Sequence, residues 1–314
     1  MTSLEASNLP IDHVDRVARA RVSLEGLSIG DALGERFFYK SEVEWLIGHH
    51  AMPAGTWKYT DDTMMALSIV EILTRYGRIE PDALAERFAE RYRSDPDRGY
   101  GPTAMGILED IGSGVPWEVA SRQAFHGEGS MGNGSAMRAG PIGAYFADSF
   151  DAVAENACNS AKVTHAHSEG QAGAIAVAIA AAQACRMHTE TSSVTPTEHA
   201  GPRSILTVAA AFTPDGKTRQ RLRTALALPF TESVAAAAAI LGNGSRVIAS
   251  DTVPFALWCA ARHLTDYESA FWATASGLGD IDTNCAIVGS IVAMAVGRLG
   301  IPRAWIDARE PLSL

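Results

Sequence analysis

The sequence is poor in basic residues, with 26 Lys and Arg against 36 Asp and Glu and a net charge of −10. Affinity for a nucleic-acid backbone comes chiefly from Lys and Arg, so this balance argues against a general nucleic-acid-binding protein. A single nucleotide-sized ligand is compatible with it, because backbone amides or a metal ion can hold the phosphates of such a ligand.

The chain also lacks the pattern of a signal peptide and any long apolar run. Its N-terminal segment has no basic region followed by an apolar stretch. The most apolar run, residues 172–182, is rich in alanine and too short for a bilayer, which needs about 20 apolar residues. The four cysteines are far apart, without CxxC spacing, and we expect them to be buried and reduced. These features predict a cytoplasmic protein without a membrane segment.

What the chain does contain is a helical spacing of apolar residues. Residues 61–76 carry this spacing up to a glycine, and Pro81 is typical of the first turn of a second helix. Two Ala-rich segments, 170–187 and 234–242, are apolar nearly all round, which predicts buried helices. Residues 254–263 and 284–299 continue the pattern.

The sequence shows no alternation of predicted strands with predicted helices, and it contains no convincing β-hairpin pattern. The polar segment 186–203 is rich in Ser, Thr and Pro and predicts a surface loop within one domain, because similar helices lie on both sides of it. We therefore predict a single all-α domain over residues 1–314, with its core at about 22–300.

Two short acidic motifs precede predicted helices. Residues 60–63 read Thr-Asp-Asp-Thr before a helix at 64–75, and residues 280–283 read Asp-Ile-Asp-Thr before a helix at 284–299. Helix capping is one interpretation, since Asp and Thr at a helix start contribute about 1 kcal/mol. A cap needs only one carboxylate, however, and each motif has two. Crowded like charges raise a pKa unless a cation neutralises them.

A divalent cation is the second interpretation of these motifs. Asp carboxylates and Thr hydroxyls are hard oxygen ligands of the kind that Mg²⁺ or Mn²⁺ takes, without His or Cys. If the two helices lie side by side, the motifs could face each other and hold two ions about 3.5–4 Å apart. Spacing alone does not show that they meet.

Residues 127–138 form a Gly-rich tract, Gly-Glu-Gly-Ser-Met-Gly-Asn-Gly-Ser-Ala-Met-Arg. Glycine allows close backbone approach, so that successive N–H groups can converge on a phosphate; a simple tight turn is the alternative. The tract lacks the ending of a Walker A loop, and no strand precedes it as in a dinucleotide-binding fingerprint.

One histidine and one aromatic residue lie near this tract. His165 belongs to a Thr-His-Ala-His segment, which has no third soft ligand nearby for zinc. A structural histidine and a phosphate-binding histidine at a helix start are the two remaining interpretations. Phe125 could stack on a base or belong to the core.

Four motifs together carry a resemblance to a known family. In order, they are Gly-Asp-Ala-Leu-Gly at 30–34, Tyr-Thr-Asp-Asp-Thr at 59–63, Gly-Asn-Gly-Ser-Ala-Met-Arg at 132–138 and Gly-Asp-Ile-Asp-Thr-Asn at 279–284. A Thr-His pair lies between the last two. Their order and spacing make the chain similar to the ADP-ribosylglycohydrolases over about residues 22–300.

The resemblance implies a soluble hydrolase that acts on ADP-ribose, with an orthogonal helical bundle and a central cleft for two Mg²⁺ ions (or Mn²⁺). The implied metal ligands are Thr60, Asp61, Asp62, Asp280, Asp282 and Thr283. The implied diphosphate-binding residues are Gly129, Ser130, Met131, Gly132 and Asn133. The implied contacts to a phosphate and to adenine are His165 and Phe125.

One position departs from the family pattern. Many members carry a Glu shortly after the first motif, where this chain has Phe38, and Glu35 lies three residues earlier. We expect Asp61 or Asp62 to act as the general base for a water that attacks the anomeric carbon. The partner is then the ADP-ribose of a modified protein or small molecule, with nucleic acid only as an ADP-ribosylated substrate. The alternatives are a non-catalytic ADP-ribose-binding protein and a hydrolase of another ADP-ribosyl or nucleoside compound.

Overall fold

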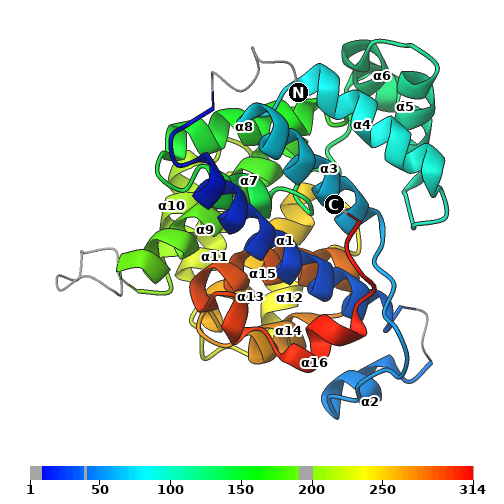
Figure 1. Ribbon diagram of the computed structural model, residues 1–314. Coiled ribbons are helices and arrows are strands. Elements are labelled where there is room, and N and C mark those ends of the chain that lie inside the picture. Colours follow the sequence, from blue (N-terminus) through cyan, green and yellow to red (C-terminus); the bar gives the residue numbers. More distant parts are fainter. Residues whose placement is uncertain (1–8, 39–40, 191–200, 314) are drawn as a thin grey trace.

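The computed structural model describes residues 9–38, 41–190 and 201–313, and within these ranges the chain forms helices and no β-strand (Figure 1). The first half contains α1 (His13–Glu35), α2 (Val43–Gly48), α3 (Asp61–Tyr76), α4 (Pro81–Ser94), α5 (Pro102–Gly112), α6 (Trp117–Gln123), the 3₁₀ helix η2 (Ala124–Gly127), α7 (Gly140–Tyr145) and α8 (Phe150–Lys162). The second half contains α9 (Ser168–Glu190), α10 (Ser204–Phe212), α11 (Lys217–Ala227), α12 (Val234–Leu241), α13 (Ala249–Arg262), α14 (Tyr267–Ala275), α15 (Ile281–Val296), the 3₁₀ helix η3 (Arg298–Gly300) and α16 (Arg303–Ala308). The predicted all-α class is confirmed. In those same ranges, no helix is both long and apolar enough to span a membrane.

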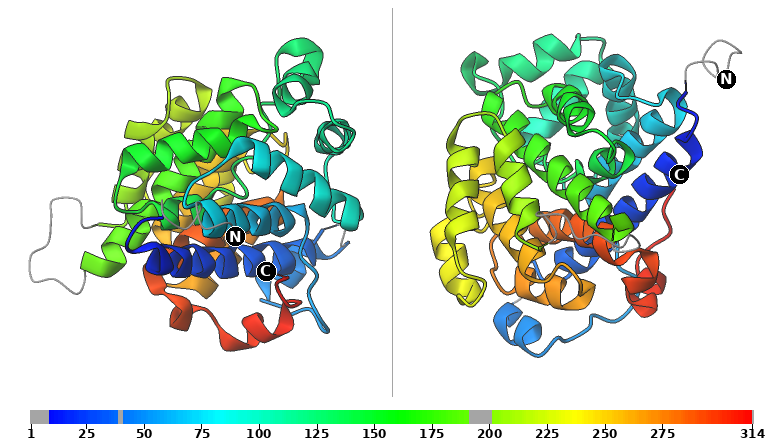
Figure 2. Two further views of the ribbon diagram at one scale, coloured as in Figure 1. Left: turned by 45° about the horizontal axis from the view of Figure 1, so that its top comes forward. Right: turned by 90° about the vertical axis from the view of Figure 1, so that its left-hand side faces the viewer.

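The central contact of the fold is between α1 and α15, the most extensive helix pair among the described residues. The two helices run side by side through the middle of the molecule (Figures 1 and 2). Helices α7, α9 and α14 pack around this pair, and α3 packs against α1. Because α3 and α15 both carry an acidic motif at their start, this arrangement decides whether the two motifs meet.

Glycines on α1, four residues apart, allow the close approach of α15. A Cβ atom on Gly30 would lie 2.1 Å from the carbonyl oxygen of Cys285, and one on Gly34 would lie 2.7 Å from Cα of Asp282. Gly26 meets α15 in the same way, one turn earlier. Residue numbers rise along α1 as they fall along α15, so the helices are antiparallel. This glycine seam leads directly to the acidic start of α15.

Helix α3 begins and ends where local sequence signals place its ends. The hydroxyl oxygen of Thr60 accepts a hydrogen bond from the backbone N–H of Asp62, which is a side-chain N-cap. Gly77, with φ of +69°, ends the helix in the left-handed conformation that glycine adopts without strain. Pro81 occupies the first turn of α4, as its position in the sequence predicts.

The start and end of α15 differ from the prediction. The sequence predicts a helix over 284–299, whereas α15 runs from Ile281 to Val296 and ends before Gly297, whose φ is +67°. The second acidic motif therefore lies mostly within the first turn of the helix. The first motif does the same, because α3 begins at Asp61.

The surface loop predicted at 186–203 is wrong for residues 186–190, which continue α9. Arg186 donates a hydrogen bond to the carbonyl oxygen of Ala147 at 2.5 Å and lies over the ring of Phe150 at 3.8 Å. These contacts stabilise the last turns of α9 on the body of the protein. Residues 201–203 form a turn, and residues 191–200 lie outside the described part of the chain.

The buried helix predicted at 234–242 is also wrong. Helix α12 buries only Ala237 and Leu241, and the side chain of Ile240 is 46% exposed. The helix packs on α11 and α13 at the surface. Exposing an alanine methyl leaves little apolar area in water, so an Ala-rich segment does not require burial all round.

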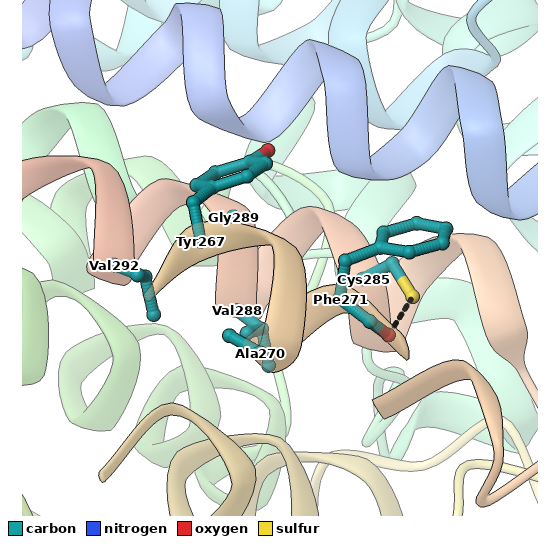
Figure 3. Close-up of a pocket in the computed structure, with 7 residues that line it drawn as sticks. All are labelled: Tyr267, Ala270, Phe271, Cys285, Val288, Gly289 and Val292. Atoms are coloured by element: carbon teal, nitrogen blue, oxygen red, sulfur yellow. Dashed lines mark hydrogen bonds between the residues drawn. The ribbon is translucent and has the colours of Figure 1, made fainter. Parts of the chain in front are cut away.

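The four cysteines are free, as expected, but only three are buried, because Cys158 is half-buried. Figure 3 shows a small internal space between α14 and α15, lined by apolar side chains that include Phe271 and Val288. It has no room for a water molecule. The hydroxyl of Tyr267 on its edge donates to the carbonyl oxygen of Gly26 at 2.5 Å. This space is therefore core packing and not a ligand site.

We predict that Gly30→Ala lowers the free energy of unfolding by about 1–3 kcal/mol, because the added methyl overlaps the backbone of α15. Gly106→Ala is the matched control, since no atom lies within 4 Å of a Cβ at this exposed position of α5. The control raises the free energy of unfolding by up to about 1 kcal/mol. Urea denaturation measures both, and equal effects of the two substitutions would contradict the close approach of α1 and α15.

Candidate active site

The two acidic motifs meet in space. The hydroxyl of Thr283, in the first turn of α15, donates a hydrogen bond to Oδ1 of Asp62, in the first turn of α3, at 3.4 Å. These residues are 221 positions apart in the sequence. Both are buried. The sequence motifs therefore contribute to one site, at the place where the starts of the two helices come together.

A fifth carboxylate, that of Asp31 on α1, organises the first motif. Its oxygens accept hydrogen bonds from the hydroxyls of Thr60 at 2.9 Å and Thr63 at 2.5 Å, and from the backbone N–H groups of the same two residues. Burial raises the pKa of Asp31 to about 6, and these hydrogen bonds oppose the rise. Asp31 belongs to the Gly-Asp-Ala-Leu-Gly motif, and the sequence alone predicts no role for it. A buried aspartate in an apolar helix is the signal that could have identified it.

Burial and mutual repulsion raise the pKa values of the first motif. The pKa of Asp61 rises to about 8, mainly by burial and then by the charge of Asp31. The pKa of Asp62 lies well above its ordinary value, again mainly by burial and then by the charge of Asp282. These aspartates therefore lie close enough to repel one another strongly, because the protein interior has a low dielectric constant.

The second motif is similar but has a polar partner. Burial raises the pKa of Asp280, while a hydrogen bond from the side-chain amide of Asn133 at 2.6 Å lowers it. The pKa of Asp282 lies well above its ordinary value because of burial and the charge of Asp280. Five carboxylates thus crowd together at this site, on α1, α3 and α15.

The donor set fits divalent cations that prefer oxygen. Oδ2 of Asp62 is buried and has no hydrogen-bond partner among the described residues, and it points to an absent positive ligand. Within the same part of the chain, no three His, Cys, Asp or Glu side chains are grouped so that they alone could hold a metal ion. The hydroxyl oxygens of Thr60 and Thr283 lie beside these carboxylates. Sets of oxygen atoms of this kind suit Mg²⁺ or Mn²⁺.

Asn133 joins the Gly-rich tract to the acidic residues. Besides Asp280, its side-chain amide donates to the hydroxyl of Thr252 at 3.0 Å, and its backbone N–H donates to the carbonyl oxygen of Val247. Gly132 pairs with Ile248 in an isolated antiparallel bridge. These bonds hold the tract beside the start of α15, so the predicted phosphate-binding loop and the acidic site are neighbours.

The same tract packs tightly on the turn before α9. Gly129 has φ of +78°, and a Cβ atom there would lie 2.6 Å from the backbone nitrogen of His167. The imidazole of His165 is buried, and its Nε2 would lie 3.2 Å from a Cβ atom on Gly132. Met131 takes part through its carbonyl oxygen, which accepts a hydrogen bond from Ala249. The structure thus places His165 beside the Gly-rich tract.

Phe125 lies at the edge of this loop and not in the core. It belongs to η2, has φ of +53° and is 57% exposed. The backbone N–H of Gly129 donates to the carbonyl oxygen of Ala124 at 2.9 Å, which ties η2 to the Gly-rich tract. The interpretation of Phe125 as a core residue is wrong, and its ring is accessible to a ligand.

Comparison with known proteins agrees with this geometry. The sequence profile of the ADP-ribosylglycohydrolase family matches residues 12–312. The ADP-ribosylhydrolase ARH3 of Gallus gallus is 30% identical over 93% of this chain and 89% of its own length, and ARH3 of Mus musculus is 27% identical over 94% and 88%. A solved structure described as an ADP-ribosylglycohydrolase-related protein complex is 25% identical, with a TM-score of 0.67 over 95% of this chain and 94% of that chain.

The chain belongs to the ADP-ribosylglycohydrolase family. It is accordingly an enzyme that hydrolyses a glycosidic bond.

In this family member, the position after the first motif is occupied by Phe38, which is half-buried against the core. Glu35, the last residue of α1, is the carboxylate nearest to it along the chain. Burial raises its pKa, and the charges of Asp31 and Asp280 raise it further. Glu35 therefore lies close enough to the acidic residues to interact with them, although it precedes Phe38 by almost one helical turn.

We predict that, in EDTA, the free energy of unfolding falls as the pH rises from about 4 to 8. Asp31 and Asp61 keep their protons to about pH 6 and 8 in the folded protein, whereas they lose them near 3.8 in the unfolded chain. Burial lowers the pKa values of His165 and His263, which opposes this trend below about pH 6.5. The raised pKa values of the five aspartates outweigh these two histidines, so the folded state binds more protons in this window and raising the pH favours unfolding. Urea denaturation at several pH values measures the slope.

Asp61→Asn flattens this slope, because the amide does not titrate. Asp215→Asn removes a carboxylate that is 87% exposed and leaves the slope as in the wild type. A stability that increases with pH over this window in EDTA would contradict the prediction.

Proposed function

We propose that the protein is a Mg²⁺-dependent hydrolase that removes ADP-ribose from an ADP-ribosylated protein side chain or a related ADP-ribosyl compound, with Mn²⁺ as the alternative ion. One observation carries the proposal. Asn133 hydrogen-bonds Asp280, so the loop suited to a diphosphate is attached to the oxygens suited to divalent cations. The printed activity of ARH3, an ADP-ribosylhydrolase, supports the same class of substrate.

The residues that would hold two ions are Thr60, Asp61, Asp62, Asp280, Asp282 and Thr283. Asp31 stays a positioning residue in this scheme, since its oxygens already accept hydrogen bonds from four groups, the hydroxyls and the backbone N–H groups of Thr60 and Thr63. When bound, the ions would neutralise the crowded carboxylates and polarise the hydroxyl oxygens of the ribose.

The protein's own groups then have distinct roles. The loop of Gly129, Ser130, Met131, Gly132 and Asn133 binds the diphosphate, with His165 as a further donor, and the exposed ring of Phe125 stacks on adenine. Asp61 or Asp62 accepts the proton of the water that attacks the anomeric carbon. Asp62 suits this role because its Oδ2 has no hydrogen bond to lose.

We also propose the cytosol as the compartment, which the four free cysteines support. The partner is an ADP-ribosyl group on a protein or small molecule, and a nucleic acid only where it carries that group.

The decisive experiment measures release of ADP-ribose from arginine- and serine-ADP-ribosylated peptides with Mg²⁺, with Mn²⁺ and with EDTA. We expect release with a divalent ion and none in EDTA, with one of the two linkages preferred. Release that persists in EDTA would contradict the metal dependence. Tight ADP-ribose binding without release from either peptide would favour another ADP-ribosyl substrate or a binding protein.

We predict that Asp62→Ala lowers kcat at least about 100-fold, the typical contribution of a general base. The substitution removes one weak hydrogen bond, that from Thr283, so the far-ultraviolet circular dichroism stays that of the wild type. Asp62→Asn, which keeps the shape of the side chain, gives the same loss. Wild-type release by either variant would refute the role of Asp62, and Asp215→Asn serves as the active control.

A further inference from the structure

The buried side chain of Arg138 is unusual because it has no carboxylate partner within salt-bridge distance among the described residues. It is fully buried and stays charged at neutral pH, although burial lowers its pKa to about 9. Its guanidinium lies over the ring of Phe88 at 4.5 Å, and its Nε has no hydrogen-bond partner in the described part of the chain. The charge of Asp61 raises the pKa of Arg138 without forming a salt bridge with it, so the hydrogen bonds of the guanidinium show what else it contacts.

The guanidinium of Arg138 points to the turn that carries His165. Its Nη2 donates to the carbonyl oxygen of Ser160 at 3.0 Å and to the hydroxyl oxygen of Thr164 at 2.9 Å. The hydroxyl oxygen of Thr164 lies 2.8 Å from Nδ1 of His165. Arginine can only donate, so Thr164 must be the acceptor in its bond with Arg138.

The direction of the second bond follows from the first. The hydroxyl of Thr164 has one hydrogen to donate, the residue is 1% exposed, and Nδ1 of His165 is its one remaining partner among the described residues. If Nδ1 carried a hydrogen, the hydroxyl hydrogen of Thr164 would be buried without an acceptor, which is costly. The bond therefore runs from the hydroxyl to Nδ1, and a neutral His165 carries its hydrogen on Nε2.

The Nε2 atom faces the place that a ligand oxygen would occupy. It has no hydrogen-bond partner among the described residues. A Cβ atom on Gly132 would lie 3.2 Å from Nε2 and 3.1 Å from the hydroxyl oxygen of Ser130, so both polar groups border the space that this glycine leaves open. The imidazole is neutral at physiological pH, because burial and the charge of Arg138 lower its pKa to about 3.

We propose that Arg138 and Thr164 are positioning residues that fix His165 as the Nε2–H tautomer, so that this N–H donates to a diphosphate oxygen held beside Gly132. The proposal rests on the proposed function for the nature of the ligand. It adds that His165 binds the anion as a neutral donor, and that the positive charge behind it is that of Arg138.

The first test measures the tautomer of His165 in the free wild-type protein. In protein labelled with ¹⁵N-histidine, the spectrum of the free wild type is compared with that of His165→Asn, which identifies the two nitrogen signals of His165 among nine histidines. We expect a protonated Nε2 and an unprotonated Nδ1 at neutral pH. A protonated Nδ1 would contradict the proposed hydrogen bond from Thr164 to His165, whatever the protein binds.

The second test removes the hydroxyl of Thr164, which links Arg138 to His165. We expect Thr164→Val, which replaces the hydroxyl by a methyl of similar size, to give a mixture of tautomers. Binding of ADP-ribose then weakens by the inverse of the Nε2–H fraction, which is about twofold for an equal mixture. Thr164→Ser restores both. In turnover, KM rises and kcat stays near the wild-type value, because the diphosphate is remote from the anomeric carbon.

A third variant tests the space beside Gly132 separately from the hydrogen bonds that join Arg138, Thr164 and His165. Gly132→Ala fills the space beside Nε2, so we expect it to weaken ADP-ribose binding while the tautomer of His165 stays that of the wild type. An unchanged affinity in Thr164→Val would overturn the proposal. If the wild type neither binds nor releases ADP-ribose, the proposed function is wrong, and so is the proposed hydrogen bond from His165 to a diphosphate. The tautomer of His165 in the free protein still tests the hydrogen bonds from Arg138 through Thr164 to His165.

Discussion

Glycine in place of larger side chains lets α1 approach α15 until backbone meets backbone, as at Gly30 and Cys285. This contact sets the distance between the elements that carry the site. Asp31 lies on α1 next to Gly30, and Asp282 lies at the start of α15 opposite Gly34. A side chain larger than hydrogen at any of these glycines would separate the helices and, with them, the acidic residues. Stability and the site therefore depend on the same seam.

Electrostatic repulsion opposes the close approach of the acidic residues. Burial and mutual repulsion raise the pKa values of all five aspartates, from Asp31 to Asp282. Donors from threonine and from Asn133 offset part of the cost, and the uncompensated Oδ2 of Asp62 marks where they do not. The charge of Arg138 lowers the pKa of Asp61 but does not cancel the effect of burial, so these five carboxylates are suited to a positively charged ligand.

The other half of the site has the opposite requirement, because we propose that it binds an anion in a protein with a net charge of −10. It has few exposed charges for this purpose. The Gly-rich tract offers backbone and hydroxyl groups, and the imidazole of His165 is placed beside Gly132. Arg138 supplies a positive charge from the interior, where water screens it little. Asn133 connects this half to the acidic half, so that the position of one depends on the other.

Much of this protein follows from the sequence alone. Apolar spacing, Thr60 as an N-cap, Gly77 at a helix end and Pro81 at a helix start are local signals, and local signals predict the all-α class and several of the helices. The types of residue in the two acidic motifs and in the Gly-rich tract likewise indicate which chemistry to expect of each. The burial of α12 was not predictable in this way, because it depends on which helices cover it.

Tertiary structure decided what these pieces do together. The bond between Thr283 and Asp62 joins residues 221 positions apart, and no periodicity carries that information. Asp31 reads in the sequence as one aspartate in an apolar helix and becomes the acceptor for both threonines only when α1 and α3 pack together. The link from Arg138 through Thr164 to His165 arises in the same way. Local patterns determine which groups are available, and long-range packing determines which of them meet.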